Sequence, residues 1–267
     1  MFSTGTVWKN VAAVRQRAPI IHSITNFVVM NTTANALLAA GASPIMAHAP
    51  EEMAEMAGIA SALVLNIGTL TKPWVESMML AGMAARERRL PVVLDPVGAG
   101  ASSLRTTTAL EILEKVRPAV VRGNGSEILA LAGAAGDTRG VDSARTAHEA
   151  VDGARALARR YGAVVVVSGA EDVVTDGDAL WLVRGGSPLM PRVTGMGCTA
   201  TVLVAAHVAV AADVLEGAVT GMAAMSAAGA LAARRSQGPG SFQVAFLDVL
   251  HSLDLVTVRD EVEVVRA

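Results

Sequence analysis

The chain has 267 residues, of which 52% are hydrophobic and 17% charged, and its formal net charge is −2. This composition excludes a disordered chain, and without a Lys/Arg cluster it indicates neither a nucleic-acid partner nor an anionic membrane. The single cysteine excludes an intramolecular disulfide framework and a thiolate-rich metal site. Because the first 20 residues also lack the pattern of a signal peptide, we expect a cytoplasmic protein.

Short apolar runs alternate with longer helical patterns over the first two thirds of the chain. Strands are predicted at 19–24, 43–47, 62–68, 90–96, 118–124 and 162–169, and helices at 29–41, 72–89, 106–116 and 143–161. Alternation of this kind is typical of βαβ units, and the unbroken run "AVVVVS" suits a strand that is buried on both faces. We therefore predict an α/β fold with a central, mostly parallel sheet covered by helices on both faces.

The pattern changes after residue 170. The turn "TDGD" predicts a β-hairpin over 171–186. Three helices are then expected, at 197–211, 213–234 and 241–253. The apolar stretch 217–233 is too short and too rich in Ala and Gly for a membrane span, so it predicts a buried helix of a soluble core. The last stretch, 259–267, is interpreted as a helix end or a loose tail, and the whole chain, 1–267, as a single domain.

Polar and adaptable residues follow several of the predicted strands. Ligands of open parallel sheets bind beyond the carboxyl ends of the strands, which makes these positions candidate site residues. They are Asn26, Met46, Asp95, Arg122, Glu127 and Ser168. Two interpretations of Asp95 stay open, a carboxylate that points into the crevice and an Asp that starts a turn before Pro96.

Alternative interpretations also stay open for the segment "RGNGSE" and for Ser168. Asn124 and Glu127 have the spacing of a capping box, but Glu127 and Asp95, at the ends of different strands, also form a carboxylate pair that suits Mg²⁺. Arg122 is either a bidentate phosphate ligand or a member of a surface ion pair. Ser168 is either a ligand of the same site or an ordinary turn residue.

The segment "TGMGC" precedes a long apolar run. Gly195 and Gly197 let the backbone approach a ligand closely, and the helix that follows offers unpaired N–H groups and its dipole to an anion. The same position is expected to lower the pKa of the Cys198 thiol and make a reactive thiolate. The alternative is that Cys198 is a small residue packed where helix and sheet meet.

Two rival classes of enzyme match this region less well. The letters "GMGCTA" fit a dinucleotide-binding fingerprint, but two prolines interrupt the preceding segment and Glu216 falls in a helical pattern. A cysteine nucleophile needs a histidine base, and none of the five histidines can be placed beside Cys198 from the sequence.

Four segments, taken together, resemble hydroxyethylthiazole kinases, which are thiamine-salvage enzymes of the ribokinase-like superfamily. They are "ITNFVVMNTTANALLAAGASPIMAHAPEEM", "LDPVGAG", "RGNGSEILALAG" and "VTGMGCTAT". The match runs in order from about residue 20 to "GPGSF" near 240. The resemblance implies phosphorylation of the primary alcohol of 4-methyl-5-(2-hydroxyethyl)thiazole by ATP with Mg²⁺.

The resemblance also implies roles for individual residues. It implies substrate contacts at Met46 and Gly195, ATP contacts at Arg122 and Ser168, a metal-associated pair at Asp95 and Glu127, and a thiol in the anion hole at Cys198. Family members are trimers with active sites at subunit boundaries, so a homotrimer is expected.

The chemistry assigns two further roles. Phosphoryl transfer asks mainly for positioning and charge stabilisation, so the amides of Gly195, Gly197 and Cys198 are expected to form an anion hole and Cys198 to accept the hydroxyl proton. Asn26 is expected to orient the heterocycle. A kinase of a hydroxymethylpyrimidine- or pyridoxal-type alcohol, a cysteine-nucleophile hydrolase and a non-catalytic binding protein are the alternatives.

Overall fold

A nine-stranded sheet runs through the protein in the computed structural model, which describes residues 2–134 and 147–267. In chain order the strands are β1 (Ile20–Ile24), β2 (Ser43–Ile45), β3 (Ala62–Asn66), β4 (Val92–Asp95), β5 (Val120–Asn124), β6 (Val164–Ser168), β7 (Glu171–Thr175), β8 (Leu180–Arg184) and β9 (Glu263–Arg266). Their order in the sheet is β2-β1-β3-β4-β5-β6-β7-β8-β9. The pairs from β2 to β6 are parallel and those from β6 to β9 antiparallel, so the predicted mostly parallel sheet is confirmed.

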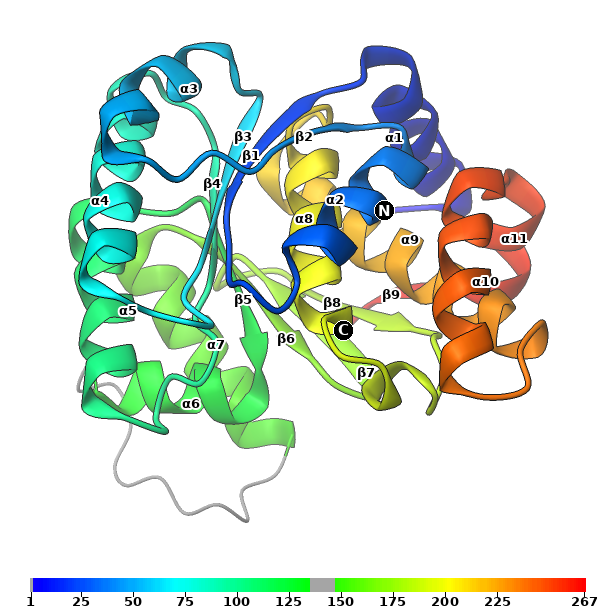
Figure 1. The fold of residues 1–267 in the computed structure, drawn as a ribbon. Coiled ribbons are helices and arrows are strands. Elements are labelled where there is room, and N and C mark those ends of the chain that lie inside the picture. Colours follow the sequence, from blue (N-terminus) through cyan, green and yellow to red (C-terminus); the bar gives the residue numbers. More distant parts are fainter. Residues whose placement is uncertain (1, 135–146) are drawn as a thin grey trace.

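Helices cover both faces of this sheet (Figure 1). One face carries α3 (Met53–Ile59), α4 (Lys72–Glu87), α5 (Ser103–Lys115), α6 (Gly125–Ala134) and α7 (Ala147–Tyr161). The other carries α1 (Thr4–Arg17), α2 (Met30–Ala40), α8 (Met196–Val208), α9 (Val214–Arg234), α10 (Pro239–Ser252) and α11 (Leu255–Glu261). Short 3₁₀ turns lie at Pro50–Glu52 and Met190–Arg192.

Each central strand contributes side chains to both layers. Along β3, Leu63 and Leu65 pack in the core beneath α3–α7, whereas Val64 packs in the core beneath α8 and α9. Successive side chains of a strand point to opposite faces, so a strand between two helical layers must be apolar at every position. This requirement explains the unbroken apolar runs in the sequence.

The six predicted parallel strands and the hairpin are all present, and β7 and β8 form its arms. Two helices begin earlier than predicted: α5 starts at Ser103, where the Ser102 side chain caps it, and α10 starts at Pro239. Residues 143–146 of the predicted helix 143–161 lie outside the described residues, and α7 covers the rest.

The prediction for the last residues is right only in part. Residues 259–261 close α11 as a helix end, but residues 263–266 form β9, which pairs antiparallel with β8, and Arg184 of β8 donates a 3.2 Å hydrogen bond to Glu263. Helices α1, α3 and α6 have no counterpart among the predicted elements, and α11 overlaps only the stretch 259–267. In α1 the sequence signal is a capping box between Ser3 and Thr6.

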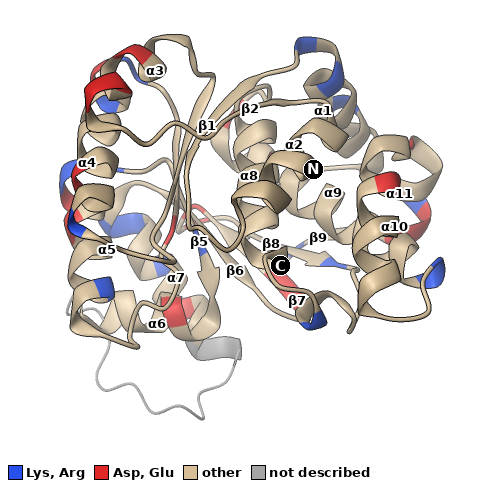
Figure 2. Ribbon diagram, viewed as in Figure 1, with Lys and Arg blue, Asp and Glu red and all other residues tan. Residues whose placement is uncertain are grey.

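Helix α9 is long and apolar enough to cross a membrane, yet 72% of its most apolar window is buried among the described residues. It packs against α1, α8, α10 and α11, as expected for a core helix. In the view of Figure 2, Lys and Arg stand next to Asp and Glu on outer helices such as α4 and α11.

Candidate active site

Helix α8 begins at the carboxyl edge of the sheet with a glycine in a left-handed conformation. Gly195 is the N-cap residue, with φ +84°, and a Cβ there would lie 2.9 Å from Cγ1 of Val29. Other residues are strained at this φ, so glycine fits both the conformation and the close approach of α2. The first turn of α8 contains no acidic residue. Its free N–H groups and the helix dipole are the features on which the predicted anion-binding site rests.

Four strand-end side chains point toward the α8 side of the sheet. Their immediate predecessors Leu65, Leu94, Val121 and Val167 all pack in the core beneath α3–α7. Because side chains alternate along a strand, the next residues face α8. These are Asn66, Asp95, Arg122 and Ser168. Three of the four are predicted site residues, and the register of the parallel strands brings them to one edge.

The Cys198 thiol lies between two asparagine amides. Asn66 donates from Nδ2 to Sγ over 3.2 Å, and Asn26 does so over 3.6 Å. The two amides are also joined to each other, because Nδ2 of Asn26 donates to Oδ1 of Asn66 over 2.8 Å. This arrangement presents N–H dipoles to sulfur, which favours a thiolate over a thiol.

Asp95 is buried behind this group, with a side chain only 1% exposed. Its Oδ2 accepts hydrogen bonds from Nδ2 of Asn66 (2.8 Å) and Oγ1 of Thr201 in α8 (2.7 Å). Burial raises the carboxyl pKa to about 6, although the charge of Arg122 and the two hydrogen bonds oppose the rise. The Asp95 side chain is thus held by residues of β3 and α8 rather than by a turn before Pro96.

The expected lowering of the thiol pKa does not occur. Burial and the nearby Asp95 carboxylate raise the pKa of Cys198 to about 11, even though Asn66, Arg122 and Asn26 act in the opposite direction. The helix N-terminus was the only influence visible in the sequence, and the structure adds desolvation and a negative charge that outweigh it.

Arg122 is a buried guanidinium with few partners. It is 8% exposed, and Nη2 donates a 2.6 Å hydrogen bond to Oγ of Ser168. Nε has no partner, and among the described residues Arg122 forms no ion pair, so the surface ion pair is wrong. A Cβ at Gly197 would lie 2.9 Å from Nη1, which puts the guanidinium against the first turn of α8. A buried positive charge beside free N–H groups is suited to phosphate.

Glu127 has two roles at the start of α6. Its Oε2 accepts from the backbone N of Asn124 (2.8 Å), and its own N donates to Oδ1 of Asn124 (2.9 Å), which is a capping box. In addition, Oε1 accepts from the backbone N of Gly98, in the loop after Asp95, over 2.8 Å. Among the described residues no group of three or more His, Cys, Asp or Glu side chains forms a metal site. Any metal here would have to take its remaining ligands from phosphate and water.

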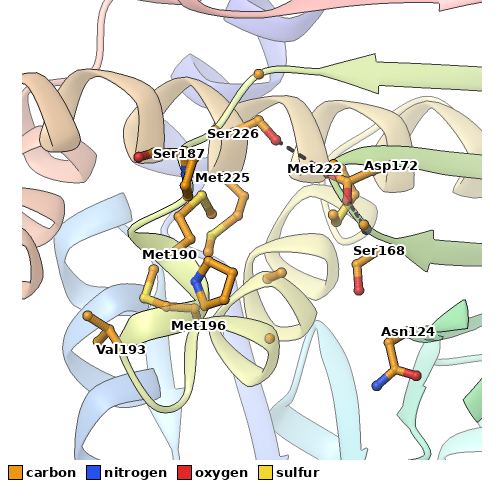
Figure 3. Close-up of a pocket in the computed structure, with 18 of the residues that line it drawn as sticks. Asn124, Ser168, Asp172, Ser187, Met190, Val193, Met196, Met222, Met225 and Ser226 are labelled. Atoms are coloured by element: carbon orange, nitrogen blue, oxygen red, sulfur yellow. Dashed lines mark hydrogen bonds between the residues drawn. The ribbon is translucent and has the colours of Figure 1, made fainter. Parts of the chain in front are cut away.

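A cavity of about 820 Å³ lies next to this edge, between the ends of β5 and β6, the segment 185–193, α8 and α9. Arg122, Ser168, Gly195 and Gly197 line it, whereas Asn26, Met46, Asp95, Glu127 and Cys198 do not. Figure 3 shows Met190, Met196 and Met225 on one side of the cavity and Asn124 and Ser168 on the other. The cavity is therefore apolar at one end and polar next to Arg122.

Met46 and the histidines lie away from the thiol. Met46 directly follows β2 and is half-buried at the same sheet edge. His22 and His48 contact the backbone of Ala47 and Met46, and His207 contacts Thr220 in the core. No histidine side chain that the structure describes contacts Cys198, so the structure offers no base for a cysteine nucleophile.

Three residues of this region were absent from the predicted site. Asn66 ends β3 and was detectable, since it is the polar residue that closes the apolar run "ALVLN". Thr201 lies one turn into an apolar helix, and only the packing of α8 on β4 reveals its bond to Asp95. Asp172 of β7 lines the cavity and accepts from the backbone N of Gly169 (3.0 Å). Burial raises its pKa.

Comparison with known proteins gives one consistent result. The model of the hydroxyethylthiazole kinase family matches residues 11–255. The hydroxyethylthiazole kinase of Nitratidesulfovibrio vulgaris (strain DSM 19637 / Miyazaki F) is 70% identical over 263 residues, which cover 98% of each chain. The solved hydroxyethylthiazole kinase from Pyrococcus horikoshii OT3 superposes with a TM-score of 0.92 at 42% identity, covering 98% of this chain and 99% of that one. A pyridoxal kinase from Staphylococcus aureus in complex with ADP (TM-score 0.64, 15% identity, 93% and 99% coverage) shares the fold.

Proposed function

The chain belongs to the hydroxyethylthiazole kinase family, and on this basis we propose which role each residue has in the reaction. The protein is a kinase that transfers the terminal phosphoryl group of ATP to the hydroxyl group of 4-methyl-5-(2-hydroxyethyl)thiazole, a step of thiamine biosynthesis and salvage. The active site is assigned to the junction of α8 with the ends of β3, β4 and β5. The observation that carries this assignment is the buried guanidinium of Arg122 beside the first turn of α8, which forms no ion pair with any residue that the structure describes.

The phosphates of ATP are held by Arg122, Ser168 and the backbone amides of Gly195, Gly197 and Cys198. Charge on the transferring phosphoryl group is spread over its outer oxygens, so fixed N–H dipoles and a guanidinium stabilise the transition state without reorganising. The rest of the nucleotide occupies the cavity of about 820 Å³, whose methionine-lined end suits an apolar ring.

Cys198 accepts the proton of the substrate hydroxyl. Its two amide donors, Asn26 and Asn66, stabilise the thiolate, while burial keeps it strongly basic. A base of this strength is able to take a proton from an alcohol as the new P–O bond forms. The thiol makes no covalent intermediate in this scheme, in keeping with the lack of a described histidine beside it.

The carboxylates of Asp95 and Glu127 fit Mg²⁺ as a pair. A magnesium ion prefers one or two carboxylates together with water and phosphate oxygens, and Glu127 is tied to the loop after Asp95 through Gly98. Both Glu127 oxygens already accept backbone N–H groups, so we assign Asp95 the closer position. Bound Mg²⁺ would neutralise charge on the phosphates.

The thiazole ring is assigned to the surface of Asn26 and Met46, with Gly195 at its phosphate side. This part of the site is separate from the cavity, because neither the buried Asn26 nor the half-buried Met46 lines it. The next residues, Phe27 and Val28, are apolar and 60% and 61% exposed. These features support a homotrimer in which a neighbouring subunit completes the acceptor pocket. The cytoplasm is the compartment proposed for the enzyme.

One assay tests the proposed function. ADP release is measured with the thiazole alcohol, with hydroxymethylpyrimidine and with pyridoxine, and Arg122→Met is compared with wild type. We expect ADP with the thiazole alcohol and a loss of about 10²- to 10³-fold in the variant, because one transition-state donor is removed. Arg86→Met is the control, since among the described residues Arg86 bonds only a backbone carbonyl at the exposed end of α5. No ADP with any alcohol would overturn the assignment.

A further inference from the structure

Arg105, in the first turn of α5, ties two loops of the sheet edge together. Its Nη1 donates to the carbonyl oxygens of Ile67 (3.0 Å) and Val97 (2.6 Å), and Nη2 donates to that of Gly68 (2.5 Å). Ile67 and Gly68 follow β3, and Val97 follows β4. A single guanidinium therefore spans the loops of two neighbouring parallel strands.

Each of these loops carries one part of the assigned site. In the β3 loop, the backbone N of Gly68 donates to Oδ1 of Asn66 (3.0 Å), and Asn66 contacts the Cys198 thiol. In the β4 loop, the residue after Val97 is Gly98, whose N donates to Glu127. The first loop orients the group around the proton acceptor, and the second joins the two carboxylates on the phosphate side.

The hydrogen bonds of the Arg105 guanidinium are all with backbone carbonyls, while its backbone N donates to the Ser102 cap. Among the residues that the structure describes, the guanidinium forms no ion pair and no hydrogen bond with another side chain. Its effect therefore depends on the planar fork of the guanidinium, which reaches three oxygens in a fixed geometry. Lysine carries the same charge on a single nitrogen and cannot reproduce that fork.

We propose that Arg105 is a positioning residue that fixes the distance between the proton-acceptor side and the phosphate side of the active site. The proposal rests on the assigned kinase site and goes beyond it, because Arg105 touches neither Cys198 nor the cavity lining. Displacement of reacting groups by about 1 Å is enough to lower a rate about 10²-fold, so loosening this connection should act on turnover rather than on ligand affinity.

The test compares Arg105→Met and Arg105→Lys with the control Arg86→Met, which also removes a guanidinium from a backbone carbonyl. We expect kcat to fall about 10²-fold in Arg105→Met, with KM for ATP and for the thiazole alcohol changed less than about threefold. Arg105→Lys should recover only part of the loss, and Arg86→Met should match wild type. Wild-type kcat in a folded Arg105→Met or Arg105→Lys protein, or a loss confined to KM, would overturn the proposal.

A second measurement does not depend on kinase activity. Cys198 is the only cysteine, so its alkylation by iodoacetamide can be followed by mass spectrometry. We expect the alkylation rate to change severalfold in both Arg105 variants and to stay the same in Arg86→Met. If wild type makes no ADP but this difference is found, the proposed function fails and the positioning role stands. Unchanged alkylation together with unchanged kcat would reject the role of Arg105 alone.

Discussion

Asn66 donates a hydrogen bond to the thiol of Cys198 over 3.2 Å. The same nitrogen donates to Asp95 over 2.8 Å, so one amide faces the thiol and the buried carboxylate at once. Asn66 separates two groups that would repel each other as anions, and it offers each an N–H. Residues of β3 and β4, and not only those of α8, therefore determine whether Cys198 is a thiol or a thiolate.

Substitution of Cys198 distinguishes a proton acceptor from a nucleophile. Cys198→Asp should remain active, because a carboxylate can take the hydroxyl proton. Cys198→Ala should lose about 10²- to 10⁴-fold in kcat, the usual contribution of a general base. Cys198→Ser is the size-matched control and should resemble Ala, since a hydroxyl is far less acidic than a thiol. The base role would be rejected by an inactive but folded Asp variant.

The pH dependence of the rate should follow the thiolate. The Cys198 pKa is raised to about 11, so the thiol is protonated at neutral pH and its thiolate fraction grows as the pH rises. For wild type we expect log kcat/KM to increase with a slope near 1 between about pH 7 and 9. Cys198→Asp should show a smaller slope, because a carboxylate is already ionised over this range. A flat wild-type profile would be inconsistent with Cys198 as the base.

Asp95→Asn should stabilise the fold while it impairs catalysis. The folded-state pKa of Asp95, about 6, lies above its ordinary value of 3.8, so the folded chain binds the proton more tightly and stability falls as pH rises through this window. Asparagine does not titrate, so it removes this pH dependence of stability. Its side-chain oxygen can still accept the hydrogen bonds from Thr201 and Asn66. We expect a gain of up to about 3 kcal/mol in the free energy of unfolding at pH 7, and little gain below pH 3.8.

Urea unfolding of the two proteins at both pH values measures this difference. The exposed Asp248 of α10 offers a control, Asp248→Asn, which should leave stability unchanged. A destabilised Asp95→Asn protein at pH 7 would show that the hydrogen bonds of Asp95 outweigh its desolvation.

Asn26→Ala tests the acceptor pocket. Asn26 contacts Asn66 and Cys198, and the loss of one hydrogen bond to the heterocycle should raise KM for the thiazole alcohol about three- to tenfold. KM for ATP should not change, since Asn26 does not line the cavity. Asn35→Ala in α2, where the amide bonds only Asn31, is the control. Equal Michaelis constants in wild type and Asn26→Ala would remove Asn26 from the pocket.

The methionine-lined end of the cavity predicts loose selection of the nucleotide base. Met190, Met196 and Met225 adapt their shape, and the nearby Ser187 hydroxyl already accepts from the backbone of Leu189 (3.2 Å). Apolar pockets discriminate between similar ligands by about 10- to 200-fold, so kcat/KM for GTP and CTP should lie within that range of ATP. Steady-state kinetics with each nucleotide measure it. A preference of about 10⁴-fold would instead indicate a hydrogen bond to the adenine ring.

Much of the fold was predictable because an unbroken apolar run in the sequence indicates a buried strand. The runs at β3 and β6 are apolar at every position, and only a strand between two helical layers requires that. β9 was not predicted, since its four residues alternate weakly and become a strand only by pairing with β8. The candidate site was predicted where a residue ends a strand, as at Asp95 and Ser168. Thr201 and the raised pKa of Cys198 depend on packing between distant segments, which sequence spacing does not reveal.

The proposed anion hole of Gly195, Gly197 and Cys198, an anion cradle at the start of α8, is built on a deeply enclosed helix. Every residue of α8 from Thr199 to Val208 is buried, and the helix packs against α2, α9, β1, β3 and β4. Such a helix cannot move outward without unpacking the core, so the position of the cradle is fixed and both ligands must bind to it there. The parts of the site free to diversify are then the edge loops around Asn26 and Met46. A protein of this architecture should accommodate new acceptor alcohols far more readily than a new kind of transferable group.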